Sequence, residues 1–261
     1  MNGKEVRLNR ILRNGKALII PMDHGVSMGP VKGLVDMDDT VSKVVEGGAS
    51  AVLLHKGIIR SLKTVPNNCG IIAHFSASTS LGPDANKKVR TGSVEEAIRL
   101  GADAVSLHIN IGCKTEPEMI FKLGEFADKC DQWQIPLIAM MYARGENVKT
   151  PLDPANVAMV CRIGAELGAD IVKCNYTGSP ETFKDVVAGC PVPVVIAGGA
   201  KADDDRALLE MVEGAMTAGC VGLTFGRNVF QHENPTLIVR AVSKIVYEGL
   251  TAEETLEVVK I

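Results

Sequence analysis

A cycle of a short apolar run, a glycine-containing turn and a longer amphipathic stretch repeats along this chain, and it restricts the fold more than any other feature. The apolar runs are rich in β-branched residues, as is typical of strands that are covered on both faces. Strands that alternate with helices usually pair in parallel, so the cycle predicts an α/β protein. The predicted strands with their turns are ALIIPMDHG (17–25), AVLLHKG (51–57), GIIAHFSAS (70–78), AVSLHINIG (104–112), PLIAMMYARG (136–145), DIVKCNYTG (170–178), PVVIAGGAK (193–201) and GLTFGRN (222–228).

Eight such units predict a (β/α)8 TIM barrel, a fold that commonly takes about 250 residues as one domain. The chain has 261 residues, and no linker-like or low-complexity segment interrupts it. An open doubly wound sheet would also alternate strands and helices, but PMDHGVSMGP is not the glycine-rich dinucleotide turn that usually follows its first strand. We therefore expect a single barrel over residues 1–261, with a short N-terminal helix and a C-terminal helix.

The connections between strands carry their own signals. Three predicted helices end in similar phrases, GGASAV (47–52), LGADAV (100–105) and LGADIV (167–172), in which glycine stops the helix shortly before the next strand. The helical pattern is weakest over residues 57–69. Residues 4–13 are expected to form a helix that closes the bottom of the barrel.

Composition and charge exclude several classes of protein. A net charge of -3 gives no general attraction to nucleic acid or to an anionic membrane, since such binding needs clustered Lys and Arg. No run of eighteen apolar residues occurs, and the first residues, MNGKEVRLNRILRNGK, are charged, so a cytoplasmic location is expected. The seven cysteines are scattered without a CxxC pair, which predicts reduced thiols rather than disulfides or a zinc site.

The carboxyl ends of barrel strands meet at one mouth, so polar residues there are the candidates for chemistry. Lys173 lies inside the apolar run DIVKCNY. Burial disfavours the ammonium form, and a neutral amine at this position could attack a carbonyl to form a Schiff base. The alternative is a strand-end lysine that reaches solvent or pairs with a carboxylate.

Two further strand ends offer groups for proton transfer. Asp23 could accept and return a proton during C–C cleavage, or it could be a helix cap or an ion-pair partner, and His24 beside it could simply bond the backbone. Tyr142 could exchange a proton with Schiff-base intermediates, although packing is the commoner role of a tyrosine. Arg144 could clamp an anion or form a surface salt bridge.

The last two strands predict a phosphate site. Gly198 and Gly199 follow the seventh strand, Gly226 and Arg227 follow the eighth, and barrels frequently bind phosphate with these two loops. Glycines let backbone N–H groups approach the oxygens and arginine supplies charge, though tight turns with a structural arginine remain an alternative.

Other ionisable residues at strand ends give weaker signals. Lys56 could contact a substrate anion or remain solvated. His55, His74 and His108 lie on different strands without a metal-binding spacing, so we expect no catalytic metal.

Six motifs, IIPMDHGVSMGP, AVLLHKG, PLIAMMYARG, ADIVKCNYTG, VVIAGG and GLTFGRNVFQH, together resemble the DhnA-type archaeal class I aldolases from about residue 5 to 249. The resemblance implies a transaldolase-like step without a cofactor, from 1-deoxy-D-threo-hexo-2,5-diulose 6-phosphate to L-aspartate semialdehyde, on a route to 3-dehydroquinate and aromatic amino acids. It implies a homo-oligomer. It also implies that Lys173 forms the Schiff base, that Asp23 accepts a proton and that Tyr142 donates one. The implied substrate contacts are Asp23, His24, Gly25, Val26, Ser27, Tyr142, Ala143, Arg144, Lys173, Gly198, Gly199, Gly226 and Arg227.

The chain departs from the family pattern at a few positions. The family usually has Pro in place of Ala143 and Thr-Ser or a similar pair in place of Cys174-Asn175. Fructose-bisphosphate aldolases of the same family tend to read DHGIEHGP and to carry Trp shortly before the tyrosine. Here the stretches read DHGVSMGP and MMY, which favours the transaldolase-like activity. The two alternatives are a fructose-bisphosphate aldolase and a sugar-phosphate-binding barrel that forms no imine.

Overall fold

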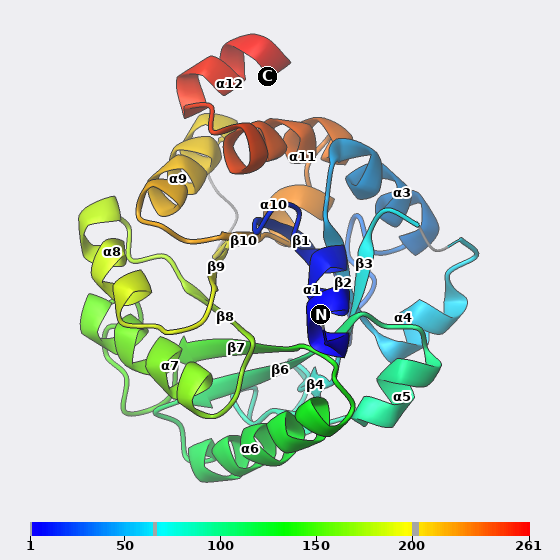
Figure 1. The fold of residues 1–261 in the computed structure, drawn as a ribbon, viewed down its shortest axis with the longest axis vertical. Coiled ribbons are helices and arrows are strands. Elements are labelled where there is room, and N and C mark those ends of the chain that lie inside the picture. Colours follow the sequence, from blue (N-terminus) through cyan, green and yellow to red (C-terminus); the bar gives the residue numbers. More distant parts are fainter. Residues whose placement is uncertain (1, 65–66, 200–203) are drawn as a thin grey trace.

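Eight parallel strands form a closed barrel in the computed structural model, which describes residues 2–64, 67–199 and 204–261 (Figure 1). Neighbouring strands follow the order β1-β10-β9-β8-β7-β6-β3-β2. All eight predicted strands are present, although residues 200 and 201 of the seventh predicted segment lie outside the described residues. The barrel strands are β1 (Ala17–Pro21), β2 (Ala51–His55), β3 (Gly70–His74), β6 (Ala104–Ile111), β7 (Leu137–Ala143), β8 (Ile171–Asn175), β9 (Val194–Ala197) and β10 (Gly222–Thr224).

Helices surround the barrel, and most connect one strand to the next (Figure 1). In the connection for which the sequence pattern was weakest, the described residues form one short helix, α4. The helices are α1 (Gly3–Ile11), α2 (Gly25–Met28), α3 (Met37–Gly47), α4 (Lys56–Ser61), α5 (Val94–Arg99), α6 (Glu116–Gln132), α7 (Pro154–Glu166), α8 (Pro180–Ala188), α9 (Asp205–Thr217), α10 (Arg227–Phe230), α11 (Pro235–Ser243), the π-helical turn Lys244–Glu248 and α12 (Ala252–Val259).

The three repeated phrases at helix ends share a structural role. Their glycines Gly48, Gly101 and Gly168 have φ values of 110°, 73° and 95°, a left-handed conformation that stops a helix. Two residues after Gly101 and Gly168, the carboxylates of Asp103 and Asp170 accept the backbone N–H groups of Ile71 and Leu137 at 2.9 and 2.8 Å. The same short phrase therefore ends a helix and holds the next strand against its neighbour.

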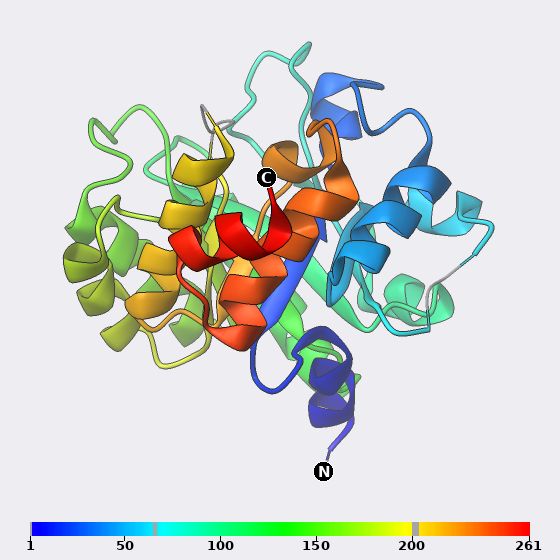
Figure 2. The same cartoon turned by 90° about the horizontal axis from the view of Figure 1, so that it is seen from above.

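Apolar side chains form two layers. One cluster fills the barrel interior and includes Ile19, Leu53 and Ile171, while a larger one packs the outer faces of the strands against the helices. Ile11 of α1 belongs to the interior cluster. The expected N-terminal helix thus covers one end of the barrel, the lower end in Figure 2.

A two-stranded antiparallel sheet that the sequence pattern did not predict stands at the opposite end, which is the mouth of the barrel (Figure 2). It consists of β4 (Ser76–Ala77) and β5 (Val89–Arg90), joined by the loop 78–88. The loop brings side chains from between β3 and α5 to the mouth.

The other structural expectations concern cysteines and membrane spans. All seven cysteines are buried free thiols. Among the described residues, no helix combines the length and the apolar character that crossing a membrane requires.

Candidate active site

A cavity of about 480 Å³ opens at the carboxyl ends of the strands, within the size range of small-molecule sites. Most of the expected substrate contacts line it, but Gly25 and Ala143 do not. Successive side chains on a strand point to opposite faces. Tyr142 faces the barrel interior, and the next residue, Ala143, therefore packs on the outer face of the strand. The predicted residues that line the cavity are Asp23, His24, Val26, Ser27, Tyr142, Arg144, Lys173, Gly198, Gly199, Gly226 and Arg227.

Lys173 lies at the centre of β8 and points into the barrel. Ile171, two residues earlier, belongs to the interior cluster, and Met140 pairs with Lys173 across the β7–β8 ladder. The lysine is only 6% exposed, and burial lowers the pKa of its amine to about 8, against an opposing effect of the Asp23 carboxylate. An appreciable fraction of the amine is therefore neutral near pH 7 to 8 and able to act as a nucleophile.

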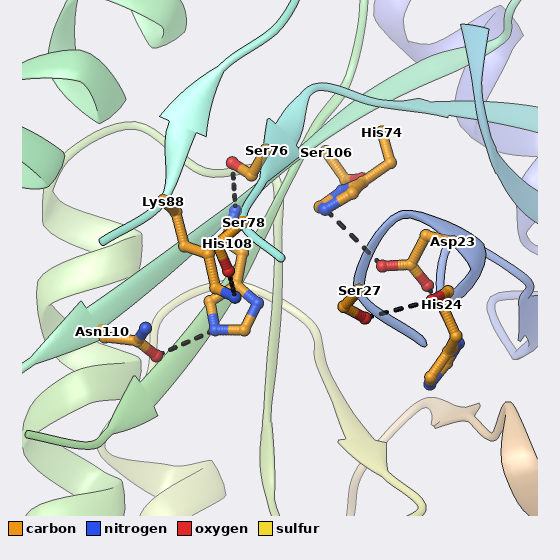
Figure 3. Close-up of polar contacts among 10 residues, drawn as sticks. All are labelled: Asp23, His24, Ser27, His74, Ser76, Ser78, Lys88, Ser106, His108 and Asn110. Carbon is orange, nitrogen blue, oxygen red and sulfur yellow. Dashed lines mark hydrogen bonds and ion pairs between the residues drawn. The ribbon is translucent and has the colours of Figure 1, made fainter. Parts of the chain in front are cut away.

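Asp23 follows β1 and faces several imidazoles (Figure 3). Its carboxylate oxygens lie 3.6 Å from His74 Nε2 and 3.4 Å from His24 Nδ1. Burial alone would raise the pKa of Asp23, but His74, His24 and Lys173 outweigh that effect and hold the pKa well below its usual range. The carboxylate is therefore ionised over the whole neutral range and can accept a proton.

Tyr142 ends the inward row of β7. Burial raises the pKa of its phenol well above the usual value, although the charge of Arg144 opposes this, so the phenol keeps its proton at neutral pH. The Arg144 guanidinium lies 5.2 Å from the centre of the tyrosine ring, within cation–π distance. Both side chains line the cavity, as expected from their spacing.

The loops after β9 and β10 meet at one side of the cavity. The guanidinium of Arg227 donates to the carbonyl of Gly199, and Asn228 Nδ2 donates to the carbonyl of Gly198 at 3.0 Å. A Cβ on Gly226 would lie 2.6 Å from the His24 ring and 2.8 Å from the carbonyl oxygen of Pro21. A larger residue at this position would therefore have to displace the His24 ring or the backbone next to β1.

Several residues of the cavity were not singled out from the sequence. Ser78 and Lys88 come from the loop between β4 and β5, and Asn175 and Thr224 come from the ends of β8 and β10. Loop residues without periodicity carry no signal of their position. Asn175 and Thr224, however, follow the inward alternation of their strands, which could have identified them.

The strand-end histidines and Lys56 have different surroundings. His55, His74 and His108 line the cavity, whereas the Lys56 amine lies 3.1 Å from Glu96 and does not line it. His74 Nδ1 lies 2.7 Å from Ser106 Oγ, and His108 Nε2 lies 2.8 Å from Asn110 Oδ1. Within residues 2–64, 67–199 and 204–261, no three His, Cys, Asp or Glu side chains are arranged to hold a metal ion.

Comparison with known proteins adds a family relationship. A family model described as DeoC/LacD family aldolase matches residues 17–232. The 2-amino-3,7-dideoxy-D-threo-hept-6-ulosonate synthase of Halobacterium salinarum is 44% identical, over 97% of this chain and 95% of that protein. The 2-amino-3,7-dideoxy-D-threo-hept-6-ulosonate synthase 1 of Archaeoglobus fulgidus is 45% identical, over 98% of this chain and 96% of that protein.

A solved structure is also similar. An archaeal fructose-1,6-bisphosphate aldolase, with its catalytic lysine covalently bound to the carbinolamine intermediate of the substrate, is 32% identical and superimposes with a TM-score of 0.88. The match covers 94% of this chain and 100% of that one. The likeness therefore extends over the whole barrel and not over isolated motifs.

Proposed function

The chain belongs to the DeoC/LacD aldolase family, and on that basis we propose that it is a 2-amino-3,7-dideoxy-D-threo-hept-6-ulosonate synthase. It transfers a three-carbon unit from 1-deoxy-D-threo-hexo-2,5-diulose 6-phosphate to L-aspartate semialdehyde. The product supplies a route to 3-dehydroquinate and aromatic amino acids. The observation that carries the proposal is Lys173, a buried amine with a lowered pKa inside the barrel and next to an ionised Asp23.

Lys173 begins the reaction as a nucleophile. Its neutral amine adds to the ketone carbon next to the methyl group of the donor, giving a carbinolamine that loses water to form an imine. The protonated imine withdraws electrons, so the C–C bond between the third and fourth carbons of the donor can break and leave an enamine on the lysine. The departing aldehyde carries the phosphate.

Asp23 and Tyr142 handle the protons. The Asp23 carboxylate takes the proton of the hydroxyl group as the C–C bond breaks, and it returns that proton when the enamine attacks the aldehyde of aspartate semialdehyde. The Tyr142 phenol keeps its proton at neutral pH and donates it to the carbinolamine oxygen as water leaves. Hydrolysis of the new imine frees the seven-carbon product, which combines four carbons of the acceptor with three of the donor.

The loops after β9 and β10 bind the phosphate of the donor. Gly198, Gly199 and Gly226 let the backbone approach the oxygens, and Arg227 contributes the positive charge. Val26 and Ser27 complete this side of the cavity next to Asp23 and His24. The chain acts on small molecules and, with a net charge of -3, has no general attraction to nucleic acid or membranes.

Borohydride trapping tests the Schiff base. Incubation with the deoxydiulose phosphate followed by reduction is expected to give an adduct that peptide mapping assigns to Lys173. Lys56 is the matched control, since it also follows a strand but is paired with Glu96. An adduct on Lys56, or no adduct, would contradict the mechanism, and the second result would favour a barrel that only binds sugar phosphates.

The second candidate is a fructose-bisphosphate aldolase, which the similarity to the solved archaeal enzyme favours. Discrimination between substrates lies in the ratio of kcat/KM values. We expect transfer from the deoxydiulose phosphate to aspartate semialdehyde to be much faster than cleavage of fructose 1,6-bisphosphate. Equal or faster cleavage of the bisphosphate would move the assignment to the second candidate, with the roles of Lys173, Asp23 and Tyr142 unchanged.

A further inference from the structure

Lys88 and Arg144 bring two positive charges to the cavity, and no carboxylate of the described residues forms an ion pair with either of them. Both side chains line the cavity, yet in the part of the chain that the structure describes neither lies within 4 Å of a carboxylate. Burial lowers the pKa of Lys88, and the charge of Arg144 lowers it further, against the opposing effects of Asp23 and Asp84. Two cations that repel each other in one cavity favour the binding of an anion that contacts both.

The local contacts hold the Lys88 amine at the cavity. Its Nζ atom donates to Ser78 Oγ at 2.5 Å, and the Ser78 hydroxyl itself donates to the carbonyl of Ala85 at 2.9 Å. Figure 3 shows the lysine and Ser78 beside His108, as a group separate from Asp23, His24 and His74. A lysine ammonium has three N–H donors, and Ser78 takes one of them. The remaining donors are available to a ligand.

Arg144 is also free to bind. Its guanidinium lies over the ring of Tyr142, 5.2 Å from the ring centre, and an arginine over an aromatic ring keeps the N–H groups at its edge for a carboxylate. Among the described residues that line the cavity, Asp23 supplies the one carboxylate, against Lys88, Arg144, Lys173 and Arg227. The cavity therefore has enough positive charge for two anionic groups.

We propose that Lys88 and Arg144 form a subsite for the carboxylate of the acceptor aldehyde, with Ser78 holding the Lys88 amine in position. This inference rests on the proposed function, in which the donor carries one phosphate and the acceptor one carboxylate. The loops with Gly198 and Arg227 take the phosphate, so the carboxylate needs a second cationic group in the same cavity. A compact carboxylate suits one ammonium and one guanidinium fork, because each of its two oxygens can accept from a different cation.

Two measurements distinguish an effect on acceptor binding from an effect on donor binding. Borohydride trapping with the deoxydiulose phosphate alone gives the donor concentration for half-maximal labelling of Lys173. Transfer at saturating donor then gives kcat/KM for aspartate semialdehyde and for 3-aminopropanal, the same aldehyde without the carboxylate. The variants are Lys88→Met, Lys88→Arg and the control Lys87→Met, whose lysine lies on the same loop but pairs with Glu118 at 3.5 Å.

The Lys88→Met substitution is expected to lower kcat/KM for aspartate semialdehyde by roughly tenfold to a hundredfold, the usual effect of losing a charge-assisted hydrogen bond. It should leave kcat/KM for 3-aminopropanal and the donor concentration for half-maximal labelling within about twofold, as should Lys87→Met. Lys88→Arg, which keeps the charge, should restore part of the loss.

Other outcomes would overturn the inference. If Lys88→Met lowers kcat/KM equally for both aldehydes, the lysine does not bind the carboxylate. If it raises the donor concentration for half-maximal labelling, the lysine binds the phosphate instead. In either case, labelling of Lys173 in the wild-type protein would still support the proposed function. A wild-type protein that is not labelled at all would contradict both the proposed function and the carboxylate subsite.

Discussion

The Nε2 atom of His74 lies 3.6 Å from a carboxylate oxygen of Asp23, while Nδ1 of the same ring lies 2.7 Å from Ser106 Oγ. Burial lowers the pKa of His74 to about 4, against the effect of Asp23, so the ring is neutral at pH 7. If the Ser106 hydroxyl donates to Nδ1, the N–H of Nε2 faces the carboxylate. Asp23 is thereby oriented by a group fixed on β3 and β6.

Replacing His74 with Gln should lower kcat by roughly tenfold to a hundredfold, because Asp23 would be misplaced and not lost. The pH midpoint of Lys173 labelling should stay the same, because His74 is neutral at pH 7 and that midpoint follows the lysine amine and the Asp23 charge. His232→Gln is the control, because His232 pairs with Asp205 at 3.2 Å and neither residue lines the cavity. An unchanged kcat in His74→Gln would show that His74 does not orient Asp23.

Imine formation should follow the ionisation of Lys173. The amine is the reactive form, so the rate of labelling should rise with pH and level off above about 8, the pKa to which burial lowers this lysine. Asp23 raises the pKa of Lys173, and Asp23→Asn should therefore move the midpoint to lower pH. Asp205→Asn removes a carboxylate outside the site and should leave the pH midpoint of labelling unchanged. A midpoint near 10.5, the ordinary value for lysine, would contradict the burial argument.

Substitution of Gly226 with Ala should disturb the phosphate loops. The added Cβ would meet His24 and the carbonyl of Pro21, so His24 or the loop must move. We expect the donor concentration for half-maximal labelling to rise roughly tenfold and the free energy of unfolding to fall by about 1–3 kcal/mol. Gly57→Ala is the control, since nothing lies within 4 Å of its Cβ. Borohydride trapping measures the donor concentration, and urea denaturation measures the free energy of unfolding. If Gly226→Ala and Gly57→Ala require the same donor concentration, the loop that contains Gly226 does not bind the phosphate.

Activity should not depend on a metal ion. The protonated imine withdraws the electrons that a divalent ion would otherwise accept in C–C cleavage. Dialysis against EDTA is expected to leave kcat/KM unchanged. Loss of activity that zinc restores would refute the Schiff-base mechanism as the sole source of catalysis.

The protein is expected to be a homo-oligomer. Its outer helices leave large apolar side chains exposed, among them Phe121 at 65% and Met159 at 58%. Sedimentation at micromolar concentration should give a species heavier than one chain. A species of 27.7 kDa, the mass of one chain, would show that the prediction is wrong.

The sequence alone determined the barrel and most of the central residues. The periodicity of strands and helices is a local property of the sequence. The eight strands and the glycines that end the helices could therefore be identified segment by segment. The carboxyl ends of parallel strands must meet, and this constraint was enough to bring Lys173, Asp23, Tyr142 and the two glycine loops to one mouth. The family resemblance assigned the proposed roles to the same residues.

Tertiary structure alone decided which of the remaining polar residues belong to the site. Lys56 follows a barrel strand, but its partner Glu96 comes from another helix and draws it away from the cavity. Lys88 lies in a loop without periodicity, and only the pairing of β4 with β5 carries it to the mouth. The pKa values of Lys173 and Asp23 likewise depend on burial and on His74, which is distant in sequence. Position relative to other strands is a non-local property, so a single stretch of sequence does not contain it.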